Sequence, residues 1–383
     1  MKIIIIGTAY PYRGGLAVFN ERLALQFQQE GHDIEICTFT LQYPKMLFPG
    51  KTQYTNDPAP QGLTIYRQIN SVNPFNWFRV GREIRKKNPD LVIFAYWMAF
   101  MAPAFGTIAR QVLRGHNTKI RCIGLIHNMI PHEPNILDKI LPGYFVHAMH
   151  GFTALSQSVL TDISHFDHKD RPKNWAPHPI YDHYGDLIDK MEARRRLGLP
   201  EEGHYVLFFG FIRGYKGLDL LIDAFGDPRL QDMGVKLLVA GEFYGDSKPY
   251  TDRIRQLDIN DIVILHTDYI PDSKVNQYFR ACDIVAQPYK SATQSGVTQI
   301  AFHFEKPMLV TNVGGLAETV PDGKIGYVVP PEAQAIADAL VRYYKEGHEA
   351  EFTIGVREEK KKYAWSVMTE TLTDVANQIK PKA

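Results

Sequence analysis

The chain has 383 residues, of which 45% are hydrophobic and 22% are charged, a balance that excludes a disordered chain and a small disulfide-stapled domain. At roughly 100 to 200 residues per domain, this length predicts two domains, each with its own core. Forty-three basic and forty-two acidic residues leave a net charge of +1. This balance predicts no nucleic-acid partner and no global attraction to an anionic membrane.

The cysteines and the first residues indicate a compartment. Cys37, Cys122 and Cys282 are odd in number, widely spaced and set in apolar segments, so we predict buried thiols in a reducing environment. The first apolar run, Ile3 to Ile6, is shorter than the core of a signal peptide and far shorter than the ~20 residues of a membrane span. We therefore expect a cytoplasmic protein.

The first half of the chain predicts alternating strands and helices. Ile3 to Ile6 is a continuous β-branched run, which is typical of a strand buried on both faces of a parallel sheet. Leu16 to Gly31 then places apolar residues at helical spacing and ends in a glycine. The alternation continues through predicted strands at 33–39, 91–94, 120–126 and 151–154 and predicted helices at 75–87, 102–113 and 136–149. This order predicts a parallel sheet covered by helices on both faces.

The second half repeats this organisation after a proline-rich stretch at 172–189, which predicts a linker. Its predicted strands are 205–209, 235–240, 262–265, 284–287, 308–311 and 326–329. An apolar stripe over 351–379 predicts one long final helix that contacts both halves.

The predicted fold is therefore α/β, with two Rossmann-like, doubly wound domains that face each other across a cleft lined by ligand-binding loops. We place the N-terminal domain at 1–184 and the C-terminal domain at 185–362. The remaining residues, 363–383, are predicted to form a helix that crosses back to the N-terminal domain.

The loop after the first strand carries two glycines, Gly14 and Gly15, where the first helix begins. Glycines let a ligand approach the backbone, and a helix N-terminus attracts anions, so this loop is a candidate ligand site. A tight strand-to-helix turn without a ligand is the alternative. The loop lacks the G-x-G-x-x-G pattern, and no acidic residue closes the second strand, which disfavours a nicotinamide dehydrogenase.

The loop after the predicted strand at 205–209 carries two cations, Arg213 and Lys216. Three glycines confine it: Gly210, Gly214 and Gly217. Two cations beside a helix N-terminus can neutralise a diphosphate, both when it binds and when it departs, without a metal. Solvated surface cations are the alternative.

A third candidate lies before the apolar run that begins at Ile300. Small polar residues there predict a helix N-terminus whose backbone amides bind phosphate oxygens, and an ordinary N-cap is the alternative. The segment contains Gln294, Ser295, Gly296 and Gln299.

Four blocks of the second half resemble, in order and spacing, those of the retaining nucleotide-sugar glycosyltransferases of family 4, which have the GT-B fold. The blocks are 211–217, 288–307, 311–318 and 326–330. In the first half, Gly14-Gly15 resembles the N-terminal glycine loop of that family, and His127-Asn128 resembles its cleft histidine. The resemblance covers nearly the whole chain and is stronger in the second half.

The resemblance implies that a sugar is transferred from a nucleoside diphosphate sugar to a saccharide or lipid-linked acceptor with retention, as in surface polysaccharide biosynthesis. It implies that Arg213 and Lys216 hold the diphosphate, that Gly14 and Gly15 approach it, and that His127 hydrogen-bonds the donor sugar. The other predicted donor-binding residues are Asn128, Gln294, Ser295, Gly296 and Gln299. The departing phosphate would take the acceptor proton, with no metal and no cofactor besides the nucleotide-sugar co-substrate.

The chain departs from the family pattern at two glutamates. They would fall at Ala292, or one residue later, and at Ile300, and neither is present; Glu305 lies at the wrong end of the helix. Gln294 and Gln299 could bond the same hydroxyls without a charge. The departure leaves two other functions open: a catalytically silent sugar-nucleotide-binding protein, and a GT-B epimerase that rearranges a sugar nucleotide without an acceptor.

Two weaker patterns remain. His127, Asn128, His132 and Glu133 form a polar cluster in one predicted loop. This cluster fits a sugar or acceptor contact, or a structural loop, better than a metal site, because Pro131 disfavours the helix that would bring both histidines together.

Aromatic residues beside cations mark the predicted helix at 75–87. Phe75, Trp77 and Phe78 precede Arg79, Arg82, Arg85, Lys86 and Lys87. The pattern fits peripheral contact with the inner face of an anionic membrane, and an ordinary amphipathic helix is the alternative.

Overall fold

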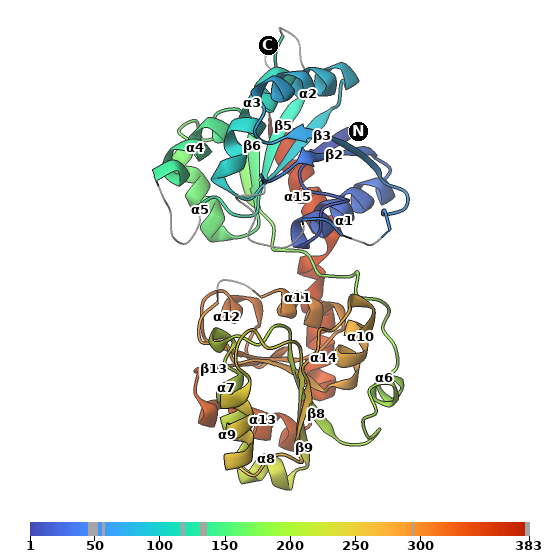
Figure 1. Cartoon of the computed structure of the whole chain (residues 1–383), viewed down its shortest axis with the longest axis vertical. Helices are drawn as coiled ribbons and strands as arrows, with labels where there is room; N and C mark the ends of the chain where they lie inside the picture. The colour runs from blue at the N-terminus through green and yellow to red at the C-terminus, as the bar shows by residue number, and fades with distance from the viewer. Residues whose placement is uncertain (45–52, 56–57, 116–118, 131–135, 293–294, 380–383) are drawn as a thin grey trace. The chain divides into compact units, whose positions relative to one another are not determined.

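The structure is a computed structural model that describes residues 1–44, 53–55, 58–115, 119–130, 136–292 and 295–379 (Figure 1). The chain forms two compact units, Met1–His178 with Tyr363–Ala383, and Pro179–Lys362. Each unit is built on one parallel sheet flanked by helices, which confirms the predicted α/β class.

The N-terminal unit holds a seven-stranded sheet in the order β3-β2-β1-β4-β5-β6-β7. The strands are β1 Lys2–Ile6, β2 Asp33–Leu41, β3 Thr64–Asn70, β4 Leu91–Tyr96, β5 Arg121–Ile126, β6 Gly151–Ala154 and β7 Lys173–Trp175. All neighbouring pairs are parallel, and Ile3 in the inner strand β1 pairs with Ile34 of β2 and Leu91 of β4. Continuous apolar runs such as Leu91–Tyr96 are buried on both faces, as parallel strands under two helical layers must be.

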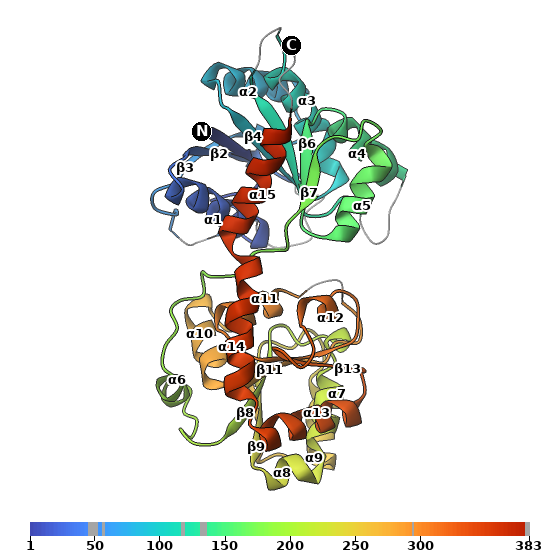
Figure 2. The same ribbon diagram turned by 180° about the vertical axis from the view of Figure 1, so that it is seen from behind.

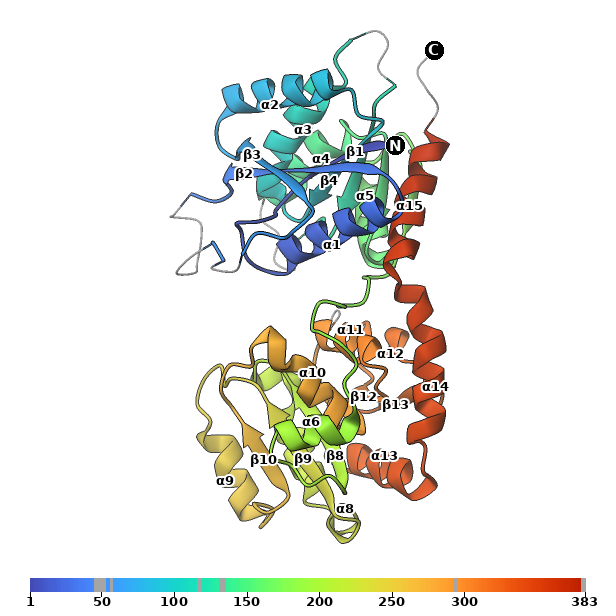
Figure 3. The ribbon, with the colours of Figure 1, turned by 90° about the vertical axis from the view of Figure 1, so that its right-hand side faces the viewer.

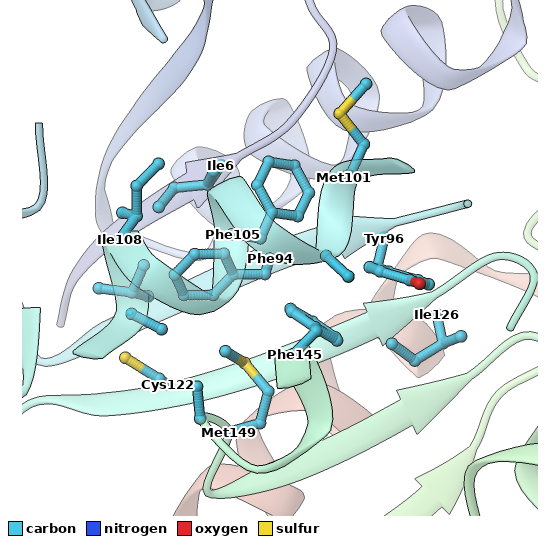
Figure 4. Close-up of a cluster of buried hydrophobic side chains, with 14 of the residues drawn as sticks. Ile6, Phe94, Tyr96, Met101, Phe105, Ile108, Cys122, Ile126, Phe145 and Met149 are labelled. Carbon is cyan, nitrogen blue, oxygen red and sulfur yellow. The ribbon is translucent and has the colours of Figure 1, made fainter. Parts of the chain in front are cut away.

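Helices cover both faces of this sheet. They are α1 Gly15–Gln29, α2 Pro74–Lys87, α3 Ala102–Val112, α4 Ile136–Val146, α5 Gln157–Phe166 and α15 Trp365–Gln378, with a 3-10 turn η2 at Ala99–Met101. α1 and α15 share one core with β1 and β4, and α15 lies along β5 and β6 (Figure 2). The core on the opposite face contains residues of α2, α3, α4 and α5. Phe94, Phe105 and Phe145 pack together in it (Figure 4).

The C-terminal unit holds a six-stranded parallel sheet in the order β10-β9-β8-β11-β12-β13. Its strands are β8 His204–Phe209, β9 Val235–Ala240, β10 Val263–His266, β11 Ile284–Gln287, β12 Met308–Thr311 and β13 Gly326–Val329. Its helices are α6 Lys190–Arg196, α7 Leu218–Phe225, α8 Pro228–Asp232, α9 Lys248–Gln256, α10 Asp272–Ala281, α11 Gly296–His303, α12 Leu316–Thr319, α13 Ala333–Glu346 and α14 Glu349–Glu359, with 3-10 turns η3 Gly214–Lys216 and η4 Lys360–Tyr363.

Alternate residues of β8 serve two cores. Val206 and Phe208 join the core formed with α7, α8, α9 and α13. Phe209 points to the other face, where it packs edge-on against Phe279 of α10, 4.9 Å between ring centroids. α10 in turn packs against α6 (Figure 3). A strand buried on both sides in this way holds the loop that follows it in a fixed position.

The prediction of one long final helix is wrong, because the segment contains two helices. α14 ends at Glu359, the turn η4 follows, and Ala364 takes an extended conformation before α15 begins at Trp365. Lys360, Lys361 and Lys362 of this turn each form an ion pair with a glutamate.

The prediction of buried thiols is confirmed, since Cys37, Cys122 and Cys282 are free and buried. Within the described part of the chain, every helix is too short or too polar to cross a membrane.

Candidate functional site

The loop after β8 is held by a short stretch of backbone pairing. Gly210, at the end of β8, has a φ of 95° that favours glycine. Ile212 then donates its N–H to the Glu242 carbonyl at 2.8 Å and accepts from the N–H of Tyr244 at 2.9 Å. These bonds extend the parallel pairing of β8 and β9, so the loop emerges at the carboxyl edge of the sheet, where open α/β sheets bind ligands.

Gly217 closes the loop against β11. Its φ is 69°, and a Cβ on it would lie 1.9 Å from the Pro288 carbonyl oxygen, so only glycine fits. The N–H of Lys290 also donates to the carbonyl of Tyr215 at 2.7 Å. The segment from Pro288 to Lys290 therefore fixes the turn that carries Lys216.

Arg213 and Lys216 occupy different settings in this loop. The exposed Arg213 guanidinium stacks 4.2 Å from the ring centroid of Tyr244. The half-buried Lys216 Nζ lies 5.6 Å from the ring centroid of Tyr289. Among the described residues no carboxylate forms an ion pair with either cation, because Asp219 on the next helix pairs with Lys290 instead.

The ammonium group of Lys216 is held in an unfavourable environment for a cation. Burial, and secondarily the charge of Arg213, lowers the pKa of Lys216 from 10.5 to about 8. A bound anion would relieve both effects, because it would supply the opposite charge that the described protein groups do not.

The N-terminus of α11 lies beside the same ammonium. Lys216 Nζ and the Val297 side chain, in the first turn of α11, lie 3.2 and 3.8 Å from the position that a Cβ would take at Gly210. The first backbone N–H groups of a helix carry a partial positive charge. The Lys216 ammonium thus lies near a helix N-terminus, and the charge of Arg213 is close enough to lower its pKa; among the described residues no carboxylate pairs with either cation, which is a setting for a phosphate group.

The predicted residues of α11 take separate roles. Ser295 caps the helix, its Oγ accepting from the N–H of Val297 at 3.2 Å. Gly296 packs below the Tyr181 ring, whose Cε2 would be 3.0 Å from an added Cβ. Gln299 is buried, and its Oε1 has no partner among the described groups. The predicted contact at Gln294 lies outside the described residues.

The positions expected for the family glutamates carry no acid. Ile300 is buried in α11, and Ala292 is half-buried. Glu305, at the end of this helix, pairs with Arg357 and Lys360 at 2.6 Å each. Its carboxylate is therefore engaged in the packing of α14 and η4 and does not replace the missing pair.

The glycine loop of the N-terminal unit has a different geometry. Gly14 has a φ of 107° and precedes α1 without a side-chain cap, and a Cβ added at Gly14 or Gly15 would meet nothing within 4 Å. Asn20, fully buried on α1, donates to the Thr8 carbonyl at 2.9 Å and so ties the loop to the helix. The open space beside both glycines fits the close backbone approach predicted for them.

His127 follows β5 at the carboxyl edge of the N-terminal sheet. Its N–H donates to the Tyr96 carbonyl at 2.8 Å, and its ring packs edge-on against Phe19, 4.7 Å between centroids. The ring Nε2 is buried and has no partner among the described groups. Burial, and then the charge of His178, lowers the pKa of His127 to about 3, so the ring is neutral at pH 7 and suited to hydrogen bonding rather than to carrying charge. Asn128 beside it is exposed.

Among the described residues no group of three or more His, Cys, Asp or Glu side chains could hold an ion, and this does not test the 127–133 cluster. His132 and Glu133 themselves lie outside the described residues.

Two aromatic residues beside the cations were not singled out from the sequence: Tyr244 under Arg213 and Tyr289 under Lys216. Tyr289 stood in the resemblance blocks without a role, and Tyr244 carried no signal. Both contacts join segments that are far apart in sequence, so no local pattern could have found them.

Two family models match the chain. The model described as Glycosyltransferase Family 4 matches residues 13–174, and the model described as Glycosyl transferases group 1 matches residues 189–360. Together they span most of both units.

Curated relatives agree with the two models. A putative teichuronic acid biosynthesis glycosyltransferase, TuaC, from Bacillus subtilis is 26% identical over 372 residues, which cover 90% of each chain. The D-inositol 3-phosphate glycosyltransferase of Acidothermus cellulolyticus is 29% identical over 196 residues, which cover 49% of this chain and 44% of that relative. The chain therefore aligns with less than half the length of this second relative.

Solved structures share the fold. Anabaena HepE in complex with UDP has a TM-score of 0.69 at 15% identity, covering 98% of this chain and 99% of that one. Sucrose-phosphate synthase from Thermosynechococcus elongatus has a TM-score of 0.66 at 16% identity, covering 98% of both chains. The chain belongs to the GT-B glycosyltransferases of the family 4 type, which confirms the resemblance seen in its sequence blocks.

Proposed function

We propose that this glycosyltransferase moves a sugar from a nucleoside diphosphate sugar to a saccharide or lipid-linked acceptor with retention of configuration, in the biosynthesis of a surface polysaccharide. One observation carries the donor assignment: Lys216, whose pKa is lowered by the charge of Arg213, lies near the N-terminus of α11, and among the described residues no carboxylate pairs with either cation. The fold relatives crystallised with UDP and with UDP-glucose support a nucleotide-sugar donor. The name of TuaC supports a polysaccharide role.

Stabilisation of the leaving group supplies most of the catalysis in this proposal. The bond from the anomeric carbon to the diphosphate oxygen breaks, and the charge that develops on that oxygen is met by Arg213, Lys216 and the α11 amides. The acceptor oxygen bonds to the same face of the anomeric carbon, and its proton passes to the departing phosphate. Neutral His127 would hydrogen-bond the donor sugar, and Gly14 and Gly15 would admit the diphosphate close to the backbone of α1.

The reaction needs no metal in this proposal, because two cations and a helix N-terminus meet the charge of the diphosphate. Adding EDTA should leave the rate unchanged. A rate that falls with EDTA and returns with Mg²⁺ or Mn²⁺ would overturn this part of the proposal.

A ligand screen tests the donor assignment. We expect one of UDP, GDP or ADP, or one of their sugars, to raise the melting temperature, because a ligand that binds only the folded state stabilises it. Transfer is then measured with the matching nucleotide sugar against a panel of saccharide and lipid-linked acceptors, and the anomeric configuration of the product is read by NMR. No shift with any nucleotide would contradict a nucleotide-sugar donor, and an inverted product would contradict retention.

A second candidate function is a catalytically silent protein that binds sugar nucleotides. It is favoured by Ala292 and the buried Ile300, which stand where the family carries its glutamates. Calorimetric binding of a nucleotide sugar without hydrolysis, transfer or epimerisation would support this candidate over the transferase.

The proposal includes peripheral contact between α2 and an anionic membrane. Phe75 is 86% exposed and Phe78 is 44% exposed. Both lie in α2, which carries five cations and one carboxylate. Exposed aromatic rings beside clustered cations fit the boundary between anionic headgroups and acyl chains. Such contact would bring the enzyme to a lipid-linked acceptor.

A further inference from the structure

Tyr289 lies between the two parts of the candidate phosphate site. Tyr289 is 3% exposed and follows β11. Contacts with two other segments hold its backbone in place. The hydroxyl of Thr311, at the end of β12, donates to its carbonyl at 2.5 Å. The adjacent Pro288 carbonyl closes on Gly217, and the Lys290 N–H bonds the Tyr215 carbonyl. Its side chain is thus fixed relative to the loop that carries Lys216.

The two ends of this side chain meet different partners. The ring face lies 5.6 Å from Lys216 Nζ, within the range of a cation–π contact. The hydroxyl lies 3.2 Å from Ser295 Oγ, the atom that caps α11. Burial raises the pKa of Tyr289 to about 12, so the hydroxyl keeps its proton at neutral pH and can donate to Ser295.

We propose that Tyr289 is a positioning residue that fixes Lys216 and the capped N-terminus of α11 relative to each other, so that both meet one phosphate group. The inference rests on the proposed function for the identity of the ligand, and on the geometry alone for the link between Lys216 and Ser295. A rigid aromatic ring suits this role, because it supports a cation without neutralising it. A carboxylate in the same place would cancel the charge that the phosphate needs.

Three substitutions separate the two ends. Tyr289→Phe keeps the ring under Lys216 and removes the bond to Ser295, whereas Tyr289→Leu removes both. Tyr327→Phe is the matched control, because Tyr327 is a buried tyrosine of β13 whose hydroxyl has no partner among the described groups. Circular dichroism and melting curves show whether each variant folds.

Inorganic pyrophosphate is the probe, since it tests the phosphate site without the base or the sugar. We expect affinity to fall about threefold in Tyr289→Phe and about tenfold in Tyr289→Leu, with no change in Tyr327→Phe. The double variant Tyr289→Leu/Lys216→Ala should bind only about threefold more weakly than Lys216→Ala, because the ring acts through Lys216 and only the contribution of the bond to Ser295 remains to be lost. Multiplicative losses in the double variant, or wild-type affinity in Tyr289→Leu, would overturn the proposal.

A ligand-free measurement keeps this test separate from the proposed function. In protein labelled with ¹³C-lysine, the Cε shift of Lys216 is followed across pH in the wild type and in Tyr289→Leu. We expect the pKa of Lys216 to change in Tyr289→Leu, because the ring both attracts the ammonium and shields it from water. An unchanged titration would overturn the role of Tyr289 even if pyrophosphate binds. Failure of pyrophosphate and all nucleotides to bind, together with a shifted titration, would overturn the proposed function and leave the positioning role supported.

Discussion

The loops after β1 and β8 occupy the same place in two sheets that share their strand order over six strands, yet they use glycine in opposite ways. Gly14 and Gly15, before α1, border empty space. Position 217, before α7, must be glycine because the Pro288 carbonyl leaves no room for a Cβ. The cations Arg213 and Lys216 lie in the same loop. A shared backbone topology therefore carries two kinds of site, one shaped for close approach and one built for charge.

The polar groups near the two loops also differ in charge. Near the loop of the N-terminal unit, the buried Asn20 and Thr38 and the half-buried His127 are neutral, and the half-buried carboxylate of Glu21 accepts from the N–H of Tyr10 at 2.6 Å. In the C-terminal unit the loop holds two positive charges without a paired carboxylate among the described residues. The first arrangement suits hydroxyl-rich ligands, and the second suits a diphosphate.

Removal of either cation is the strongest way to test the charged loop. We expect Arg213→Ala or Lys216→Ala to lower kcat/KM about 10²-fold or more, because each removes charge aimed at the leaving group. The free energy of unfolding should stay within about 1 kcal/mol of the wild type in Arg213→Ala, at an exposed site, and should not fall in Lys216→Ala, which removes a charge from an unfavourable buried environment. Lys274→Ala, an exposed cation on α10, is the control. Full activity in both site variants would refute the assignment of the loop.

The two kinds of glycine should respond differently to a methyl group. Gly217→Ala places Cβ against the Pro288 carbonyl at positive φ, and should cost roughly 2–4 kcal/mol in urea unfolding. Gly15→Ala lies in α1 with nothing within 4 Å, and should leave stability unchanged or raise it by up to about 1 kcal/mol. If a ligand fills that space, Gly15→Ala still weakens donor binding. A stable Gly217→Ala, or a Gly15→Ala protein with unaltered donor KM, would remove the contrast between the loops.

The lowered pKa of Lys216 predicts a pH dependence in the charged loop alone. As pH rises through about 8, Lys216 loses its proton in the free protein, and pyrophosphate affinity should fall by up to about tenfold per pH unit. Lys216→Arg should show no such fall, because guanidinium stays charged. Calorimetry from pH 7 to 9.5 measures this, and equal affinity across the range in the wild type would contradict it.

Stability should change with the opposite sign. Lys216 is a base whose pKa is lower folded than unfolded, so between about pH 8 and 10.5 the unfolded chain binds more protons. The destabilisation from its buried charge is fully present below pH 8 and is relieved as pH rises. The unfolding free energy of the ligand-free wild type should therefore rise with pH relative to Lys216→Ala across that window.

Strands with an apolar signal could be predicted from the sequence, and two polar edge strands of the N-terminal unit could not. The inner strands at 235–240, 284–287 and 308–311 were predicted at their observed bounds, because continuous apolar runs mark inner parallel strands, and the apolar edge strand at 326–329 was predicted as well. Thr64–Asn70 was missed, since only Ile69 in it is fully buried. Lys173–Trp175 was assigned to the linker for the same reason, being a short, polar edge strand.

In the candidate site, too, some features could be predicted from the sequence and others could not. Arg213, Lys216 and the glycines could be found because a strand-loop-helix pattern confines them locally. The need for glycine at 217 and the ring below Lys216 both come from Pro288 and Tyr289, which only folding brings to the loop. Physical partners from distant segments leave no local pattern, and they decide whether a cation is solvated or built into a site.

The outer surfaces of the two units offer the mildest test, because the exposed aromatic and basic face belongs to α2 of the N-terminal unit. We expect binding to vesicles of phosphatidylcholine with phosphatidylglycerol, weakened roughly fivefold for each cation removed in Arg82→Ala and Lys86→Ala, since each contributes about 1 kcal/mol near an anionic surface. Phe75→Ser should weaken binding further and independently of salt, because ring burial is not electrostatic. Lys274→Ala and Lys345→Ala in the C-terminal unit are the controls. Equal sedimentation of all variants with vesicles would show that α2 is an ordinary amphipathic helix whose apolar face is already used in its own core.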